Sequence, residues 1–197
     1  MMKIGVLSLQ GDFSAHAKAV EKLGSQTVLV KTTKDLDNIG GLIMPGGEST
    51  ALIRLLERSG LQTALTDAQR HGLPIFGTCA GLILIANQAL PQKQFCFGFI
   101  PVEVERNAYG SQKDSFVENI PIPAIGPLAF PCFFIRAPKI ATVSPDVEIL
   151  ARQAASPILI RYRNVLGATF HPELSDDLRV HALFLRMCGI ETKEVVK

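Results

Sequence analysis

Apolar, strand-like runs alternate with amphipathic helical segments in the first half of the chain, and this alternation constrains the fold more than any other feature. The predicted strands are residues 4–9, 27–30, 42–44 and 74–76, and the helical segments between them are residues 13–23, 50–59 and 61–71. Because β-α-β units connect with right-handed crossovers, this pattern gives a mainly parallel sheet with helices on both faces. We therefore expect an α/β fold, a three-layer sandwich.

The second half of the chain consists of short strand-like segments that are interrupted by proline and glycine. These segments are residues 97–104, 128–135, 147–150, 157–163 and 165–170. We expect them to add antiparallel strands to the sheet, with a long loop around residues 106–124. A last helix is predicted to be capped by Ser175 and to end at Gly189, before a polar tail at residues 192–197. The length fits one domain, residues 1–197.

Three predicted strands of the first half end in turns built from small residues. These turns are Leu9-Gln10-Gly11, Pro45-Gly46-Gly47 and Gly77-Thr78-Cys79. Parallel sheets place their binding sites at the carboxyl ends of the strands. All three turns are therefore expected to border one crevice.

The turn from Gly77 to Gly81 joins a short buried strand to an apolar helical segment. This layout resembles a nucleophile elbow of the G-x-S-x-G type, with Cys79 at the position of the serine. Small neighbours such as Ala80 leave room for a strained turn, and the following helix N-terminus favours a thiolate and a developing oxyanion. A cysteine at a strand–helix turn is also common as a small buried side chain, so the motif alone does not decide the function.

His171 follows the last predicted strand, and Glu173 lies two residues further on, with Pro172 between them. In an extended segment, residues i and i+2 face the same side, so the imidazole and the carboxylate are expected to project together. Such a pair can deprotonate a thiol, because the carboxylate fixes the tautomer of the imidazole. The alternative is a histidine that is satisfied locally at the sheet edge, beside a solvated glutamate.

The segment Pro45 to Thr50 contains two adjacent glycines and precedes a helix that Ser49 or Thr50 can cap. Adjacent glycines leave backbone N–H groups free to form an oxyanion hole. A phosphate-binding loop is a competing interpretation, but the lysine and the Ser or Thr of a G-x-x-x-x-G-K-[ST] motif are missing. A plain tight turn before a helix is the third interpretation.

The charge and the cysteine content exclude several classes of protein. A net charge of +2, with scattered lysines and arginines, provides no basic surface for nucleic acid or an anionic membrane. The four cysteines (Cys79, Cys96, Cys132 and Cys188) fit no zinc-binding spacing and are too few for a disulfide scaffold. The first residues lack the layout of a signal peptide, and no apolar stretch reaches membrane-spanning length. We therefore expect a soluble, cytoplasmic protein without a bound metal.

Taken together, the Gly46-Gly47-Glu48, Gly77–Gly81 and His171–Glu173 segments closely resemble the motifs of class I, triad-type glutamine amidotransferases. A finer resemblance, over nearly the whole chain, is to the glutaminase subunits of two-component pyridoxal 5′-phosphate synthases. It includes Leu9-Gln10-Gly11 with His16, residues 45–50, residues 77–82, residues 106–110, residues 134–138 and residues 169–174. The segments that contain Arg106 and Arg136 are the discriminating ones, and residues 12–15 depart from the pattern.

The resemblance implies hydrolysis of L-glutamine to L-glutamate and ammonia through a cysteine thioester, without a cofactor. In this chemistry Cys79 is the nucleophile, His171 is the base and Glu173 orients the base. The oxyanion hole is expected from the backbone N–H groups of Gly47 and Ala80. The residues implied to hold the glutamine are Gly47, Glu48, Ser49, Arg106, Ile135 and Arg136.

The resemblance also implies a protein partner. The ammonia is expected to pass to a synthase subunit that makes pyridoxal 5′-phosphate, the vitamin B6 cofactor, within a large hetero-oligomer. The glutaminase is expected to be weak or silent until this subunit docks, and His16 is expected to lie toward the partner side.

Three other functions fit parts of the pattern. The first is a glutaminase that feeds another acceptor, such as the one of imidazole glycerol phosphate synthase, and the Arg106 and Arg136 segments argue against it. The second is a γ-glutamyl peptide hydrolase, which assays with amide and peptide substrates would separate. The third is a non-enzymatic redox-sensing or interaction module that uses Cys79, and the complete triad argues against that.

Overall fold

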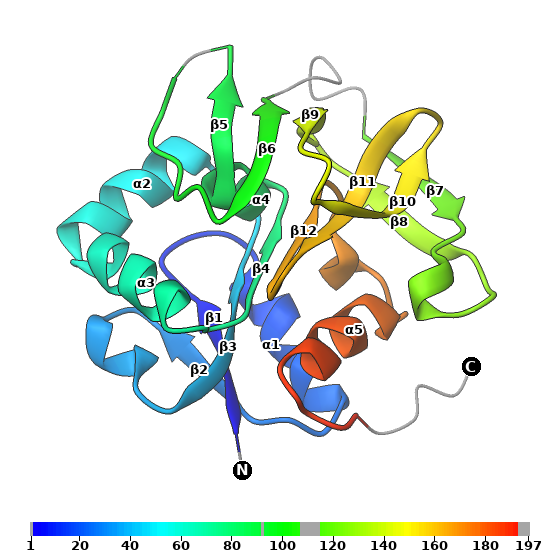
Figure 1. The fold of residues 1–197 in the computed structure, drawn as a ribbon. Coiled ribbons are helices and arrows are strands. Elements are labelled where there is room, and N and C mark those ends of the chain that lie inside the picture. Colours follow the sequence, from blue (N-terminus) through cyan, green and yellow to red (C-terminus); the bar gives the residue numbers. More distant parts are fainter. Residues whose placement is uncertain (1, 92, 107–114, 193–197) are drawn as a thin grey trace.

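A seven-stranded sheet runs through the centre of the protein in the order β10-β11-β12-β4-β3-β1-β2 (Figure 1). The computed structural model describes residues 2–91, 93–106 and 115–192, so that residues 193–197 of the expected polar tail lie outside the described residues. The strands of this sheet are β1 (Lys3–Leu7), β2 (Thr27–Val30), β3 (Ile39–Met44), β4 (Ile75–Thr78), β10 (Glu148–Gln153), β11 (Ser156–Tyr162) and β12 (Val165–Ala168). Strands β12, β4, β3, β1 and β2 are parallel, and β10 and β11 pair antiparallel beside β12. The mainly parallel sheet is confirmed.

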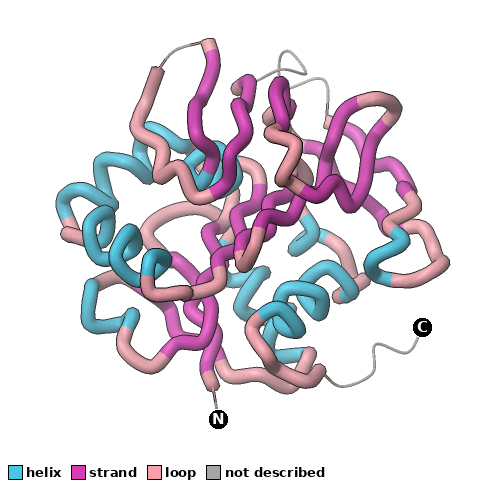
Figure 2. Tube along the Cα trace, viewed as in Figure 1, coloured by secondary structure: helices cyan, strands magenta, loops and turns pink. Residues whose placement is uncertain are grey.

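Helices cover both faces of the central sheet (Figure 2). They are α1 (Phe13–Lys22), α2 (Ser49–Arg58), α3 (Leu61–Arg70), α4 (Ala80–Ile85) and α5 (Arg179–Met187). Val20 of α1 and Phe184 of α5 are buried in one core, and Leu56 of α2 is buried in the other. Neighbouring residues of β3 alternate between the two, since Ile43 joins the first core and Leu42 the second. The expected three-layer α/β arrangement is thus confirmed.

The parallel register aligns the carboxyl ends of neighbouring strands. Ala168 at the end of β12 pairs with Thr78 at the end of β4, and Met44 at the end of β3 pairs with Gly77. Strand β1 lies on the other side of β3. The turns that follow β1, β3, β4 and β12 therefore lie along one edge of the sheet, where open α/β sheets bind their ligands.

The remaining strands form two small sheets, which corrects the expectation that residues 97–104 and 128–135 extend the central sheet. The first contains β5 (Ala86–Leu90), β6 (Ile100–Glu105) and β9 (Lys139–Val143), and the second is the antiparallel pair β7 (Phe116–Ile120) and β8 (Phe130–Phe134). Every second residue of β6 and of β8 is buried, so each strand covers a different core with one face. The sheet edge beside β12 is taken by β11 instead.

Strand β7 and a short 3₁₀ turn at Pro123–Ile125 lie where a long loop is expected from the sequence, so the prediction of a loop over residues 106–124 is wrong there. Phe116 stacks on Phe134 with ring centroids 4.7 Å apart, and this contact anchors β7 on β8. Residues 107–114 lie outside the described part of the chain. Strand β9 is likewise not predicted, and Ile140 is its one buried residue.

Glu48 caps helix α2, whereas the sequence suggests Ser49 or Thr50. Its carboxylate accepts hydrogen bonds from Thr50 N at 3.0 Å and from Ala51 N at 2.7 Å. The longer side chain reaches two N–H groups that have no partner within the helix, and it brings negative charge to the helix N-terminus. The hydroxyl groups of Ser49 and Thr50 cannot both reach these N–H groups and supply negative charge.

The ends of α1 and α5 differ in how well the sequence predicts them. Aspartate is a favoured residue before a helix, and Asp12 caps α1 by accepting from Ala15 N at 3.4 Å. The predicted Ser175 cap of α5 is wrong, because Ser175 Oγ accepts from Asp177 N at 2.9 Å and the helix begins only at Arg179. In the described part of the chain, no helix has the length and apolar character needed to cross a membrane.

Gly81 allows helix α4 to pack directly on strand β3. A Cβ atom at this position would overlap the carbonyl oxygen of Met44, which is a backbone atom inside the sheet. The close approach keeps the first turn of α4 against the end of β3, and it therefore fixes the position of the turn at Cys79.

Gly81→Ala is expected to lower the free energy of unfolding by about 3 kcal/mol, because the backbone of β3 or α4 has to move. Gly72→Ala is the matched control, since no atom lies within 4 Å of its Cβ position and only its positive φ of 94° is unfavourable. That conformation costs an alanine about 1 kcal/mol. Urea denaturation followed by circular dichroism measures both losses. Equal losses would contradict the packing role of Gly81.

Candidate active site

A cavity of about 310 Å³ lies at the carboxyl edge of the central sheet. Its lining includes every residue that the sequence singles out for chemistry or for substrate binding: Gly47, Glu48, Ser49, Cys79, Ala80, Arg106, Ile135, Arg136, His171 and Glu173. Gly11 and Asp12, from the turn after β1, also line it. The three small-residue turns therefore border one crevice, as expected.

Cys79 lies at a sharp turn between β4 and α4, with φ of 48° and ψ of −107°. A non-glycine residue rarely adopts a positive φ, and such strain is common where a side chain has to be held for function. Ala80 is the first residue of α4, so its N–H has no partner within the helix. The turn thus combines a thiol with a free backbone donor, which is the strand–turn–helix geometry predicted for residues 77–81.

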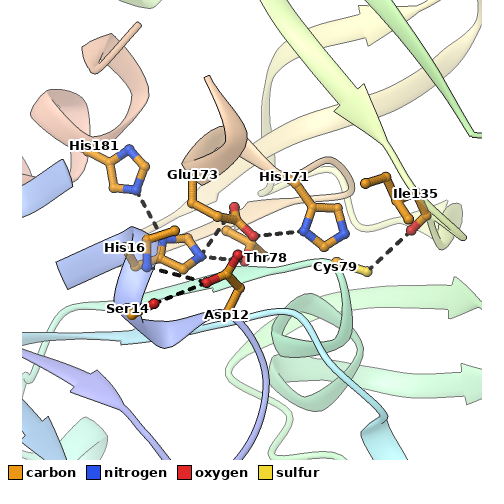
Figure 3. Close-up of polar contacts among 10 residues, drawn as sticks. Asp12, Ser14, His16, Thr78, Cys79, Ile135, His171, Glu173 and His181 are labelled. Atoms are coloured by element: carbon orange, nitrogen blue, oxygen red, sulfur yellow. Dashed lines mark hydrogen bonds and ion pairs between the residues drawn. The ribbon is translucent and has the colours of Figure 1, made fainter. Parts of the chain in front are cut away.

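His171 and Glu173 contact each other as predicted, but not for the predicted reason (Figure 3). Nδ1 of His171 lies 2.7 Å from Oε1 of Glu173. The segment is not extended, because Pro172–Leu174 form a 3₁₀ turn that brings the carboxylate back toward the imidazole. The backbone N–H of His171 donates to Phe133 O of β8 at 2.8 Å, which fixes the start of this turn.

Burial alone would lower the pKa of His171 and raise the pKa of Glu173, but their polar surroundings reverse both effects. Cys79 and Glu173 raise the pKa of His171 to about 10. The neighbouring histidines, His16 and His171, hold the pKa of Glu173 well below its usual range. At neutral pH the carboxylate is therefore ionised, and the imidazole can take a proton from a thiol and keep it.

The Cys79 thiol lies near the imidazole of His171, but its hydrogen-bond contact in this structure is with a backbone oxygen. Its Sγ lies 4.0 Å from Ile135 O, and Nε2 of His171 has no hydrogen-bond partner among the described residues. Both side chains nevertheless share the space above Gly46, where a Cβ atom would lie 2.7 Å from Cε1 of His171 and 3.3 Å from Cβ of Cys79. A glycine is needed at this point so that base and thiol can lie together.

Gln10 connects the turn after β1 to the Gly46-Gly47 turn. Its Oε1 accepts from Glu48 N at 2.9 Å, and its side chain packs against Gly47. The expected oxyanion turn is thereby tied to the first strand–helix turn of the chain. The resemblance includes Gln10 in a motif without giving it this contact.

Gln94 joins two of the residues that are expected to bind substrate. Its Oε1 accepts from Nη1 of Arg106 at 2.7 Å and from Ser49 Oγ at 3.3 Å. The other end of the guanidinium lies 3.8 Å from Glu48. No signal in the sequence indicates Gln94, because it lies in irregular chain between β5 and β6.

Ile135 and Arg136, which follow β8, also line the cavity. Arg136 has a positive φ of 45°, which is unusual for a residue with a side chain. The turn presents the carbonyl oxygen of Ile135 to Cys79. These two residues therefore shape the cavity through their backbone as well as through their side chains.

His16 is buried, so its side chain is not exposed to a partner, and the expectation that it lies toward the partner side stays a prediction. Its side chain has no exposed surface, and its Nε2 lies 3.3 Å from Oε2 of Glu173. The spacing contains a signal for this burial, since His16 shares a helix face with the buried residues Val20 and Leu23. The same holds for His181, which is also fully buried and shares a face of α5 with Leu185.

No metal site is found among residues 2–91, 93–106 and 115–192, where no three His, Cys, Asp or Glu side chains converge in a suitable way. The titratable groups that line the cavity are instead a thiol, an imidazole, carboxylates and two guanidinium groups. A cysteine at a strained elbow beside an imidazole–carboxylate pair, at the carboxyl edge of a parallel sheet, defines an α/β enzyme with a cysteine nucleophile.

The comparison with protein families narrows this class. The model of the SNO glutamine amidotransferase family matches residues 6–190, and the chain belongs to this family. The chain is 48% identical to a protein of Thermotoga petrophila named pyridoxal 5′-phosphate synthase subunit PdxT. The match extends over 186 residues and covers 94% of this chain and 99% of that protein. A protein of the same name from Pseudothermotoga lettingae is 49% identical over 191 residues, covering 96% of the chain and 97% of that protein.

Solved structures show the same fold. A crystal structure titled as a glutamine amidotransferase superposes with a TM-score of 0.90 and 39% identity, covering 95% of this chain and 99% of the other. The structure of PurLQS from Thermotoga maritima superposes with a TM-score of 0.66 at 16% identity, covering 94% and 98% of the two chains. This second likeness concerns the fold alone.

The burial of His181 predicts a loss of stability in mild acid. Burial lowers the pKa of His181 from 6.5 to about 3. Between these values the unfolded chain binds a proton at this residue that the folded chain does not, so His181 alone lowers the free energy of unfolding by about 1 to 2 kcal/mol from pH 6.5 to pH 5. The lowered pKa of Glu173 reduces stability mainly as the pH falls below its ordinary value of 4.5, outside this window.

Urea denaturation of the wild type and of His181→Gln between pH 5 and 7 tests this expectation. The glutamine cannot be protonated, so the fall in stability is expected to be shallower in the variant. Parallel curves for the two proteins would contradict the assignment.

Proposed function

We propose that this chain hydrolyses the side-chain amide of L-glutamine to L-glutamate and ammonia, and that it delivers the ammonia to a synthase subunit that makes pyridoxal 5′-phosphate. The observation that carries the proposal is the single cavity in which the Cys79 elbow faces the His171–Glu173 pair, in a member of a glutamine amidotransferase family. The relatives named pyridoxal 5′-phosphate synthase subunit PdxT support the choice of acceptor.

The first half of the proposed reaction forms a thioester. The thiolate of Cys79 attacks the side-chain carbonyl carbon of glutamine, and the electron pair of the C=O bond moves to the oxygen. Backbone N–H groups of Gly47 and Ala80 stabilise that oxyanion. His171 has taken the thiol proton on Nε2 and transfers it to the nitrogen as the C–N bond breaks, so that ammonia leaves and a γ-glutamyl thioester remains.

The second half hydrolyses the thioester. Nε2 of His171 takes a proton from water as the water oxygen attacks the thioester carbon. The C–S bond then breaks, the proton returns to sulfur and glutamate leaves. Glu173 accepts from Nδ1 of His171 at 2.7 Å, which fixes the tautomer and stabilises the imidazolium that forms in both halves.

The proposed glutamine site lies between the start of α2 and the turn after β8. Arg106 is proposed to bind the substrate carboxylate, and its contact with Gln94 supports this by holding the guanidinium in place. Glu48 is proposed to attract the substrate ammonium group with the part of its carboxylate that remains exposed. The other proposed contacts are Gly47, Ser49, Ile135 and Arg136.

Assembly with the synthase subunit is proposed to complete the site. The thiol is directed at Ile135 O, and the oxyanion turn depends on Gln10 in the first strand–helix turn. A partner that docks on this turn can therefore shift Gly47 and Cys79 together. We further propose that residues 1–197 form one glutaminase domain that works in the cytoplasm within a large hetero-oligomer.

Ammonia release from glutamine tests the function. The wild type is expected to release ammonia faster when its synthase subunit is present, and Cys79→Ala is expected to lose essentially all release, because no other group of the cavity can form the thioester. Cys96→Ala is the matched control, since Cys96 does not line the cavity and its thiol donates to the backbone oxygen of Ile83. Equal rates with and without the synthase would contradict activation by docking, and an active Cys79→Ala would contradict the mechanism.

Arg106→Gln tests the proposed substrate contact. Loss of a charge-assisted hydrogen bond of about 1.5–3 kcal/mol is expected to raise the KM for glutamine by roughly 10-fold or more, with a smaller change in kcat. Arg54→Gln removes an exposed arginine of α2 and serves as the control. An unchanged KM in Arg106→Gln would contradict the assignment.

A further inference from the structure

Two further histidines extend the His171–Glu173 pair into the protein core (Figure 3). His16 of α1 and His181 of α5 are both fully buried. Nε2 of His16 lies 3.3 Å from Oε2 of Glu173 and 3.2 Å from the hydroxyl of Thr78, and its Nδ1 lies 3.0 Å from Nε2 of His181. With the 2.7 Å contact between His171 and Glu173, four titratable side chains form one continuous chain.

Phe76 of β4 fixes the orientation of both buried imidazoles. Its ring centroid lies 6.4 Å from that of His16 and 6.2 Å from that of His181, with interplanar angles of 85° and 80°. Edge-to-face packing of this kind is specific in geometry, and Phe76 is itself completely buried. Neither imidazole can therefore turn without disturbing the core.

The partners determine where each proton lies. Glu173 is ionised and accepts from Nδ1 of His171 on Oε1, while its buried Oε2 has no partner in the described structure apart from the 3.3 Å contact with Nε2 of His16, so Nδ1 of His171 and Nε2 of His16 each carry a proton. A neutral His16 then has a lone pair on Nδ1, and the 3.0 Å contact requires that Nε2 of His181 donates to it. Nδ1 of His181 is left as a bare acceptor, and this atom has no hydrogen-bond partner in the described structure.

The opposite arrangement is less favourable. If His16 donated from Nδ1, then His181 would have to carry its proton on its own Nδ1. This would bury an N–H group without an acceptor among the described residues, and buried N–H groups without partners are rare because their desolvation is not compensated. A protonated His16 has the same consequence. The chain of hydrogen bonds therefore has one direction.

We propose that His16 and His181 are positioning residues for the glutaminase reaction, in which His181 donates to His16 and His16 donates to the far oxygen of Glu173. The carboxylate is then held at both ends, so that its near oxygen stays aimed at Nδ1 of His171. The inference rests on the proposed glutamine hydrolysis, because the base that is positioned is His171. Neither buried histidine touches the cavity, and both act through Glu173.

The second donor matters because the charge on His171 changes during the reaction. When His171 becomes an imidazolium, its positive charge attracts Oε1 of Glu173 more strongly, and this attraction weakens when His171 is neutral again. A carboxylate held at one oxygen alone can turn with these changes, whereas one that is also held at Oε2 keeps the imidazole in place. Loss of the donor also leaves a buried, charged oxygen with a missing partner.

A pair of substitutions at His16 separates positioning from simple packing. His16→Leu keeps much of the volume but removes the donor, whereas His16→Gln brings an amide N–H close to the position of Nε2. With the synthase subunit present, we expect His16→Leu to lower kcat for ammonia release by about 10- to 100-fold with little change in KM. His16→Gln is expected to recover most of this loss.

His71→Leu, the same change at an exposed histidine, is the control and should keep the wild-type rate. Equal losses in His16→Leu and His16→Gln would assign the effect to packing and would overturn the proposal. A wild-type kcat in His16→Leu would overturn it as well.

The ¹⁵N NMR signals of the imidazole nitrogens report the tautomers in the isolated chain, without any turnover. We expect the proton on Nε2 in both His16 and His181. In Glu173→Gln, the amide has one donating and one accepting end, so at least one of the two flanking histidines, His16 or His171, has to reverse its tautomer. A wild-type proton on Nδ1 of His16, or no reversal in Glu173→Gln, would overturn the directed chain.

The two measurements distinguish this inference from the proposed function. If the expected tautomers were found but the wild type released no ammonia with its synthase subunit, the proposed glutamine hydrolysis would fail, and with it the catalytic part of the inference. If the wild type were active and the tautomers were reversed, only the inference would fail.

Discussion

The parallel pairing of β12, β4 and β3 is the constraint on which the rest of the site depends. Ala168 lies opposite Thr78, so the turns that follow bring His171 beside Cys79. Because β3 is the next strand, its turn brings Gly47 to the other side of the thiol. The proposed nucleophile, base and oxyanion donor thus come from three neighbouring strand ends, and a shift in any one register would separate them.

A buried carboxylate at this edge is stable only because it is surrounded by donors. Glu173 accepts from His171 on one oxygen and contacts His16 on the other, and these partners outweigh the cost of its burial. The same contacts give the site its chemistry, since an ionised carboxylate keeps Nε2 of His171 free to exchange protons with the thiol. The core and the site are therefore not separable here, because α1 and α5 stabilise the sheet and also supply the histidines behind Glu173.

Local patterns in the sequence predict the parallel α/β fold and the residues of the cavity, because small residues that follow a strand-like run can be recognised in the sequence itself. Local patterns do not predict contacts that form only when segments distant in the sequence pack together. Gln94 lies in irregular chain and acquires a role only where β6 brings Arg106 to it. His16 has the spacing of a core residue, but its link to Glu173 requires the packed fold. Pairing of β7 with β8 is likewise decided by the stacking of Phe116 in the tertiary structure, not by its own pattern.

The central claim is that Cys79 carries the γ-glutamyl group during turnover, and acid-quenched mass spectrometry tests it most directly. The chain is mixed with its synthase subunit and glutamine, quenched within the first turnovers and digested. A mass increase of one γ-glutamyl group is expected on the peptide that contains Cys79, and it should disappear once the glutamine is consumed. Steady ammonia release without any such adduct, or an adduct on a peptide other than that of Cys79, would contradict the account.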